Sequence, residues 1–163
     1  MRIAILCENL VFGGINRYCL DLMKGLLAYP DVKPYLIAST LEAVISQRLV
    51  RKICTSCKEE YEPSEESLME LNLTKADIIG KRFFRGKGCN NCNNIGYKGR
   101  MGIYEIILMN SEIRRLITEQ ASTNTIKMAA KNNGMNTLRD SGLFAIFSGL
   151  TTIQEIVRET MIT

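Results

Sequence analysis

Two Cys-x-x-Cys pairs constrain the fold of this chain more than any other feature. Cys54 and Cys57 form the first pair and Cys89 and Cys92 the second, with residues 58–88 between them. Two thiolates three positions apart can hold one metal ion from a single tight turn, because backbone N–H groups in the turn point at the sulfurs. Two such turns supply the four soft ligands that tetrahedral zinc prefers. The spacing therefore predicts a Zn²⁺ site made of these four cysteines.

The residues around the pairs fit a metal-binding knuckle. Such a turn needs positive φ angles and close backbone approach, and glycine provides both. The second pair is flanked by Gly86, Gly88, Gly96 and Gly99. Lysines that would offset the negative charge of a zinc ion bound by four thiolates also lie beside the pairs: Lys52, Lys58, Lys87 and Lys98. The chain has no histidine, so a site of this kind must be all cysteine.

Two disulfides or a redox pair are the alternatives to zinc. A redox Cys-x-x-Cys normally opens a helix that follows a strand, and it needs only one pair. Two pairs in glycine-rich surroundings favour the metal site over both alternatives.

Composition narrows the classes of function. The chain has 163 residues, of which 46% are apolar, which is enough for one compact domain or two small ones. The net charge of +4 is mild, and aromatic residues are few, with no tryptophan. These features predict no nucleic-acid binding. No apolar run approaches the roughly 18 residues of a membrane span, so we expect a cytoplasmic protein without direct membrane insertion.

Residues 1–38 read as a βαβ unit. Arg2–Cys7 is a near-continuous apolar strand, of the kind buried in a parallel sheet. A helix is expected from Ile15 to the Tyr29–Pro30 break, followed by a short strand at Tyr35–Ala38. The glycines before the helix, Gly13–Gly14, favour a tight structural turn over a phosphate or sugar contact, because the longer G-x-G-x-x-G pattern is missing.

Residues 39–53 are predicted to form a connecting helix. Ser39 and Glu42 match a capping box. The helix would gather apolar residues on one face, namely Leu41, Val44, Ile45 and Leu49. Its other face and last turn would carry Gln47, Arg48, Arg51 and Lys52. That polar face is either solvated or a basic contact to a neighbouring subunit or a phosphate.

Residues 54–108 are expected to form a four-cysteine zinc subdomain. Between the knuckles lies an acidic segment in which Ser64 caps a short helix. Arg100–Leu108 reads as a strand, and its expected partner is Lys81–Arg85. Pairing of these two strands would give a zinc-clamped β-hairpin. Its core would be marginal without metal, so metal binding would supply folding free energy.

Residues 109–163 are predicted to form a C-terminal helical extension. Helices are expected to begin near Ser111, Thr125 and Thr137, and Thr152 and Glu155 match a second capping box. The predicted fold class is α/β, mostly α. It combines the N-terminal βαβ unit, the zinc-clamped hairpin and a C-terminal helical bundle.

From about Lys33 to its end, the chain resembles the C-terminal portion of type II secretion and type IV pilus assembly ATPases. The runs that carry this resemblance are Pro34–Glu42, Ile45–Arg51, the two cysteine pairs with Tyr61–Pro63, Gly96–Arg100, Gly102–Glu105 and Gly149–Thr152. The resemblance implies the last helix of a RecA-like ATPase core, a four-cysteine zinc subdomain and a C-terminal helical extension.

The chain departs from that family at the nucleotide site. It has no G-x-x-x-x-G-K-[ST] loop and no histidine for the family's histidine motifs, so we expect no ATP hydrolysis. The resemblance then implies a non-catalytic zinc module, cytoplasmic or peripheral at the inner membrane. Its expected partners are secretion or pilus assembly ATPase subunits and the inner-membrane platform protein. The candidate contact surface is basic and combines Gln47, Arg48, Arg51, Lys98 and Arg100.

The first 30 residues give an alternative. They resemble the opening of a family-4-type glycosyltransferase, with an apolar strand followed by Phe12–Arg17 and Leu20–Leu22. On this reading the chain is a truncated or fused glycosyltransferase fragment without activity of its own. The secretion resemblance covers more of the chain and includes all four metal ligands, so it is preferred.

Overall fold

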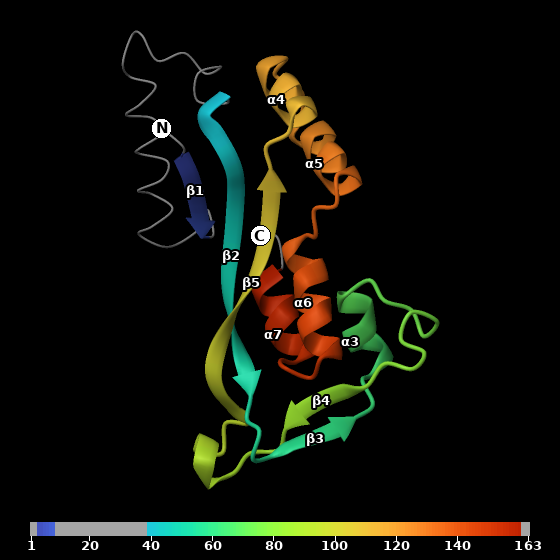
Figure 1. Cartoon of the computed structure of the whole chain (residues 1–163). Helices are drawn as coiled ribbons and strands as arrows, with labels where there is room; N and C mark the ends of the chain where they lie inside the picture. Colours follow the sequence, from blue (N-terminus) through green and yellow to red (C-terminus); the bar gives the residue numbers. More distant parts are fainter. Residues whose placement is uncertain (1–2, 9–38, 161–163) are drawn as a thin grey trace. The chain divides into compact units, whose positions relative to one another are not determined.

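A computed structural model describes residues 3–8 and 39–160 (Figure 1). The predicted Gly13–Gly14 turn, the helix that starts at Ile15 and the strand at Tyr35–Ala38 lie outside the described residues. The chain divides into two compact units. The first is Met1–Gln47 with Tyr104–Thr137, and the second is Arg48–Ile103 with Leu138–Thr163.

The N-terminal strand is confirmed. β1 (Ile3–Glu8) pairs in parallel with β2 (Leu41–Ile53), from Ile3 opposite Leu41 to Glu8 opposite Gln47. The third strand of this sheet is β5 (Tyr97–Leu108), and the strand order is β1-β2-β5. An apolar strand with a parallel neighbour is what the sequence of β1 predicts.

The predicted connecting helix at residues 39–53 is wrong, because Leu41–Ile53 is the strand β2. Apolar residues on both faces of this strand happen to fall at helical spacing, which produced the error. Two further features favour a strand: the segment is rich in β-branched residues, and it is paired along both edges as the middle strand. Adjacent side chains differ sharply in burial, since Val50 is 0% exposed and Leu49 is 46% exposed. Ser39 and Thr40 are helical, but the strand begins at Leu41, so no helix follows Ser39 and the predicted capping box fails as well.

Two of the helices for which the structure describes both ends belong to the first unit. α4 (Ser111–Thr118) is capped by Asn110, and α5 (Thr123–Asn132) is capped by Ser122, each through a side-chain oxygen that accepts a backbone N–H. The predicted starts were therefore correct to within a few residues. The helices bury a core made of Leu41, Met109, Ile113, Leu116, Ala129, Ala130 and Met135.

The second unit holds short strands and helices. Its elements, besides the parts of β2 and β5 that fall in it, are β3 (Lys58–Tyr61), α3 (Glu65–Glu70), β4 (Phe83–Gly86), the 3-10 turn η1 (Asn90–Cys92), α6 (Leu138–Phe147) and α7 (Ile153–Thr160). Ser64 caps α3 as predicted, accepting the N–H of Ser67 at 3.3 Å. The core draws on nearly every one of these elements and contains Val50, Leu68, Leu71, Phe83, Ile103, Ile146, Ile153, Ile156 and Val157.

The predicted hairpin has the wrong strand partners. β4 pairs antiparallel with β3, from Lys58 opposite Gly86 to Tyr61 opposite Phe83, while β5 pairs with β2. β3, which follows the first cysteine pair, therefore pairs with β4, which precedes the second pair. β2 and β5, which lie outside the two pairs in the sequence, pair with each other. Glu59 and Arg85 lie opposite each other and form an ion pair at 2.8 Å, which suits the observed β3–β4 register.

The α/β class is confirmed, but the C-terminal helices are divided between the units. α4 and α5 belong to the first unit, and α6 and α7 belong to the second together with the cysteine segment. The predicted boundary between a zinc subdomain at 54–108 and a helical extension at 109–163 does not match this division. The reason is the length of β2 and β5, because each strand contributes residues to both units.

The alternation along β2 can be tested by mutation. Replacing Val50 with alanine removes buried methyl groups from the core and should lower the free energy of unfolding by about 1–3 kcal/mol. The neighbouring change Leu49→Ala should cost less than about 1 kcal/mol, since Leu49 is half exposed. Urea denaturation followed by circular dichroism measures both values. Equal losses for the two variants would contradict the burial pattern of this strand.

Candidate metal centre

The four predicted ligands lie where two pairs of strands end. Cys54 directly follows β2 and Cys57 directly precedes β3, while Cys89 follows β4 and Cys92 lies in η1 before β5 (Figure 1). Since β2 pairs with β5 and β3 with β4, each cysteine pair links one strand of each ladder. The topology therefore brings the two pairs to the same place.

The sulfur atoms form a compact group. All four Sγ atoms lie within 4.8 Å of one another. Cys54 and Cys89 are separated by 3.9 Å between sulfurs, Cys57 and Cys92 by 3.8 Å, and Cys89 and Cys92 by 3.7 Å. A tetrahedron of sulfurs at ~2.3 Å from zinc has edges of about 3.8 Å, whereas a disulfide bond measures ~2.05 Å. The spacing fits four free thiols around one tetrahedral metal ion.

Backbone N–H groups point at two of the sulfurs. Gly88 donates to Cys57 Sγ at 3.3 Å, and both Cys89 and Gly96 donate to Cys92 Sγ, at 3.3 and 3.2 Å. Such bonds stabilise the thiolate form that a metal requires. They come from the residues around the second pair, where the glycines were expected to matter.

Hydrogen bonds between the main chains hold the two knuckles together. The N–H of Cys54 donates to the carbonyl of Gly96 at 2.9 Å, and the N–H of Lys87 donates to the carbonyl of Cys57 at 2.9 Å. The first bond closes the β2–β5 end and the second closes the β3–β4 end. Each knuckle is thus fixed to the other before any side chain is considered.

Glycine is required at this junction for two reasons. A Cβ atom on Gly86 would lie 1.9 Å from the carbonyl oxygen of Gly96, so no side chain fits between the two main chains. Gly88 and Gly96 adopt positive φ angles of 97° and 80°, which residues with a Cβ rarely reach. Both properties were expected of the glycines that flank the second pair.

The thiols do not ionise alike. Burial raises the pKa of Cys57 to about 12. Burial also opposes ionisation of Cys92, but the N–H groups of Cys89 and Gly96 outweigh it and lower its pKa to about 6. Four thiolates in one group would repel one another, so full deprotonation needs a bound cation. A divalent metal that prefers sulfur, such as zinc, would supply that charge.

Lysines lie beside the four cysteines in the sequence. No acidic residue occurs in the sequence between Lys81 and Tyr104. The side chains of Lys52, Lys87 and Lys98 are exposed, and Lys98 donates to Asn91 of η1. The Nζ of Lys58 instead lies 4.1 Å from the centre of the Phe84 ring. These lysines lie beside the cysteines in sequence, as a negatively charged metal–thiolate group would favour.

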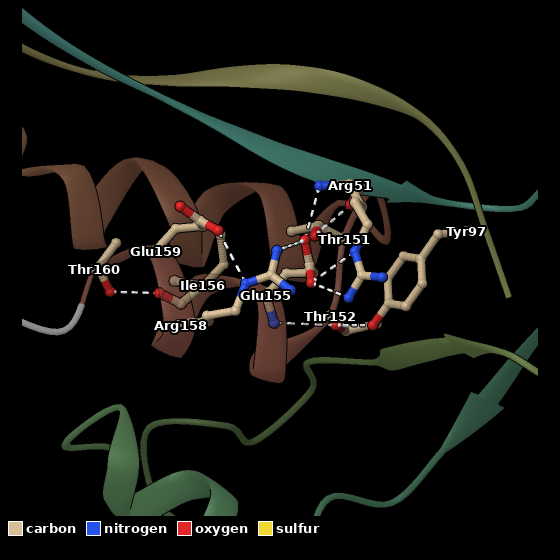
Figure 2. A network of polar contacts seen from close by, with 9 residues as sticks. All are labelled: Arg51, Tyr97, Thr151, Thr152, Glu155, Ile156, Arg158, Glu159 and Thr160. Atoms are coloured by element: carbon tan, nitrogen blue, oxygen red, sulfur yellow. Dashed lines mark hydrogen bonds and ion pairs between the residues drawn. The ribbon is translucent and has the colours of Figure 1, made fainter. Parts of the chain in front are cut away.

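The predicted basic face must be corrected at Arg51. Its guanidinium contacts Glu155 through Nε at 2.9 Å and Nη2 at 2.5 Å, and it lies 4.2 Å from the centre of the Tyr97 ring (Figure 2). Arg51 is therefore engaged within the second unit. Gln47 belongs to the first unit and Arg51 to the second. Because consecutive side chains of a strand point to opposite faces, the basic face that was predicted for a helix does not form on β2.

The capping box predicted for Thr152 and Glu155 accounts for only part of the role of Glu155. Its N–H does donate to Thr152 Oγ1 at 3.3 Å, as in a capping box, but its carboxylate is bound by arginines. The side chain is 1% exposed. Burial opposes its ionisation, but hydrogen bonds from Arg51 outweigh burial and hold the pKa of this carboxyl below its usual value. An acidic residue among the apolar residues of α7 is the one sequence signal for a buried carboxylate. Its partner Arg51 cannot be identified from sequence, because it lies too far away along the chain.

A sequence model of the family described as type II/IV secretion system protein matches residues 25–158. The chain belongs to this family. It is 42% identical over 130 residues to the type IV pilus assembly ATPase PilB of Thermus thermophilus, a match that covers 80% of this chain and 15% of that protein. It is 34% identical over 129 residues to the type II secretion system protein E of Pseudomonas aeruginosa, covering 79% of this chain and 25% of that protein.

This member of the type II/IV secretion system family spans a quarter or less of the length of those two relatives. The glycosyltransferase alternative for the first 30 residues is not favoured, because the family match already begins at residue 25. Among the helices that the structure describes, none combines the length and the apolar character that crossing a membrane requires.

The close approach of the two knuckles gives a test of the centre. Gly86→Ala places a methyl group against the Gly96 carbonyl, so we expect it to separate the knuckles and lower zinc affinity by at least about tenfold. Gly99→Ala is the matched control, because open space surrounds that position and only its positive φ of 79° costs energy. Zinc affinity is measured by competition with a chromogenic chelator. Equal affinities for the two variants would show that the contact does not shape the site.

Proposed function

We propose that this chain is a non-catalytic zinc-binding module of the type II secretion or type IV pilus assembly ATPase machinery. The observation that carries the proposal is the group of four cysteine sulfurs at tetrahedral spacing, at the junction of two strand ladders. Four thiolates fill the coordination sphere of zinc and leave no position for a reacting water. The metal therefore has a structural role.

The sequence supports the proposal that this chain does not hydrolyse ATP. It contains no G-x-x-x-x-G-K-[ST] loop to cradle the phosphates of ATP and no lysine and hydroxyl in that arrangement. The named relatives are ATPases or secretion proteins several times longer than the matched segment. ATP hydrolysis, where it occurs, is then supplied by sequence outside the matched segment. Magnesium-dependent ATP hydrolysis by the purified chain would contradict this part of the proposal.

The metal itself is the first test. Purified, reduced protein should contain close to one zinc ion per chain by elemental analysis. Cys89→Ser removes one thiolate, so it should abolish stoichiometric zinc and lower the unfolding temperature by about 10 °C or more. Cys19→Ser, at a cysteine that belongs to neither pair, should keep its zinc. Wild-type protein without metal, or a four-cysteine variant of unchanged stability, would refute a structural zinc site.

The proposed partners are ATPase subunits and the inner-membrane platform protein of the same machinery, reached from the cytoplasmic side. The contact surface is basic and consists of Lys52, Lys87, Lys98 and Arg100, which replaces the surface expected from sequence. All four side chains are exposed, and none is ion-paired within the described part of the chain. Lys52 and Lys87 each lie two positions from a cysteine of the centre, and Lys98 and Arg100 lie at the start of β5, which follows the second knuckle, so zinc would hold them in fixed relation.

Charge reversal tests this surface. The double variant Lys98→Glu and Arg100→Glu should weaken binding to the motor ATPase or the platform protein by about tenfold or more, because it creates like-charge contacts with an acidic partner. The matched control reverses two exposed lysines of α5, Lys127→Glu and Lys131→Glu, with the same change in net charge. Affinities are measured with immobilised partners at fixed salt concentration. An equal loss in both variants would show that only net charge matters.

A further inference from the structure

A buried carboxylate is the centre of a polar network beside the metal site. Glu155, in the first turn of α7, accepts hydrogen bonds from three donors of Arg51: the backbone N–H at 3.0 Å, Nε at 2.9 Å and Nη2 at 2.5 Å. Arg158 adds a fourth bond at 2.9 Å (Figure 2). Each of these four donors bonds to one of the two carboxylate oxygens, and together they hold the Glu155 side chain in one position.

Arg51 connects this carboxylate to both strands that meet at the metal. It lies on β2, three residues before Cys54, and its guanidinium lies 4.2 Å from the centre of the Tyr97 ring. Tyr97 begins β5 and directly follows Gly96. Gly96 donates its N–H to Cys92 Sγ and accepts the N–H of Cys54. The arginine and the tyrosine are thus within a few residues of two ligands, one in each knuckle.

Other bonds attach the start of α7 to the same strand ends. The hydroxyl groups of Tyr97 and Thr152 lie 2.7 Å apart, and Thr151 Oγ1 donates to the Arg51 carbonyl at 2.8 Å. The N–H of Ile53, the residue before Cys54, donates to the carbonyl of Leu150 at 2.9 Å. Each of these bonds forms only when the strand ends and the α7 start are both in place.

We propose that Glu155 is a positioning residue for the metal centre, which couples metal binding by the four cysteines to docking of the first turn of α7. The proposal rests on the zinc-binding function proposed above and names how that site is regulated. Coupling between two events is reciprocal: metal binding favours the docked helix, and the docked helix raises the affinity for metal. A partner that displaces α7 would therefore weaken zinc binding.

Metal affinity separates coupling from a purely local role of Glu155. Glu155→Gln keeps the shape of the side chain but removes the charge that holds Arg51, so zinc affinity should fall by about tenfold, in the range found for residues that support metal ligands indirectly. Glu159→Gln is the matched control: it makes the same change one turn later on α7, where the carboxylate contacts Arg158 and not Arg51. Its affinity should remain within twofold of wild type.

The reverse direction is measured on the unmodified chain. Amide hydrogen exchange of residues 153–160 should become at least about tenfold faster when a chelator removes zinc, because the docked α7 loses its support. Tyr97→Phe serves where Glu155→Gln does not fold. It keeps the ring under Arg51 but removes the bond to Thr152, and should lower zinc affinity by a few fold.

The outcomes distinguish the two proposals. A wild-type chain that binds no zinc refutes the proposed function itself. A wild-type chain that binds zinc, with equal affinities for Glu155→Gln and Glu159→Gln, leaves the zinc site intact and refutes the coupling. Unchanged exchange of α7 after zinc removal refutes the coupling too. Reduced affinity in Glu155→Gln together with faster exchange in the metal-free chain supports it.

Discussion

The arrangement of the second unit depends on the point where its two strand ladders, β2–β5 and β3–β4, end beside the same four sulfur atoms. Main-chain hydrogen bonds link Cys54 to Gly96 and Cys57 to Lys87, and the glycine at position 86 lets the two main chains touch. Burial disfavours the thiolate form of these sulfurs, and four thiolates in one group would also repel one another. A metal ion that binds all four sulfurs removes the repulsion and closes both ladders at once. A metal ion at this position would therefore both neutralise the charge on the sulfurs and join the ends of the two ladders.

The ion pair of Arg51 and Glu155 extends this junction into the core. A buried ion pair adds little net stability, since the loss of hydration offsets much of the attraction. Its benefit is geometric, because a carboxylate that accepts four hydrogen bonds admits one arrangement of its donors. Burial of apolar residues in the core, such as Ile156 and Val50, has no such directionality. The polar network instead ties the start of α7 to the ends of β2 and β5 through bonds of fixed direction.

The sequence predicts the grouping of the four cysteines better than the strands around them. The four cysteines and their glycines are close together along the chain, and their chemistry is local, so spacing alone indicates the site. The strand β2 was mistaken for a helix because its apolar residues lie on both faces, a pattern that only its neighbours β1 and β5 explain. The same holds for the β3–β4 pairing and for Glu155, whose partner Arg51 is 104 positions away. Features that depend on distant pairings were the ones that local patterns could not predict.

Electrostatics explains why the surface near the centre stays basic when the metal is bound. Zinc with four thiolates carries a net charge of about −2. On β3 and β4, the two cations Lys58 and Arg85 balance the two anions Glu59 and Glu60, so these strands carry no excess charge. Four exposed cations then remain near the knuckles, namely Lys52, Lys87, Lys98 and Arg100. The sum of these four positive charges exceeds the charge of the metal group, and Lys52 and Lys87 each lie two positions from a cysteine of the centre. Metal binding therefore reduces the positive charge of this surface without reversing it, and an acidic partner remains the complementary one.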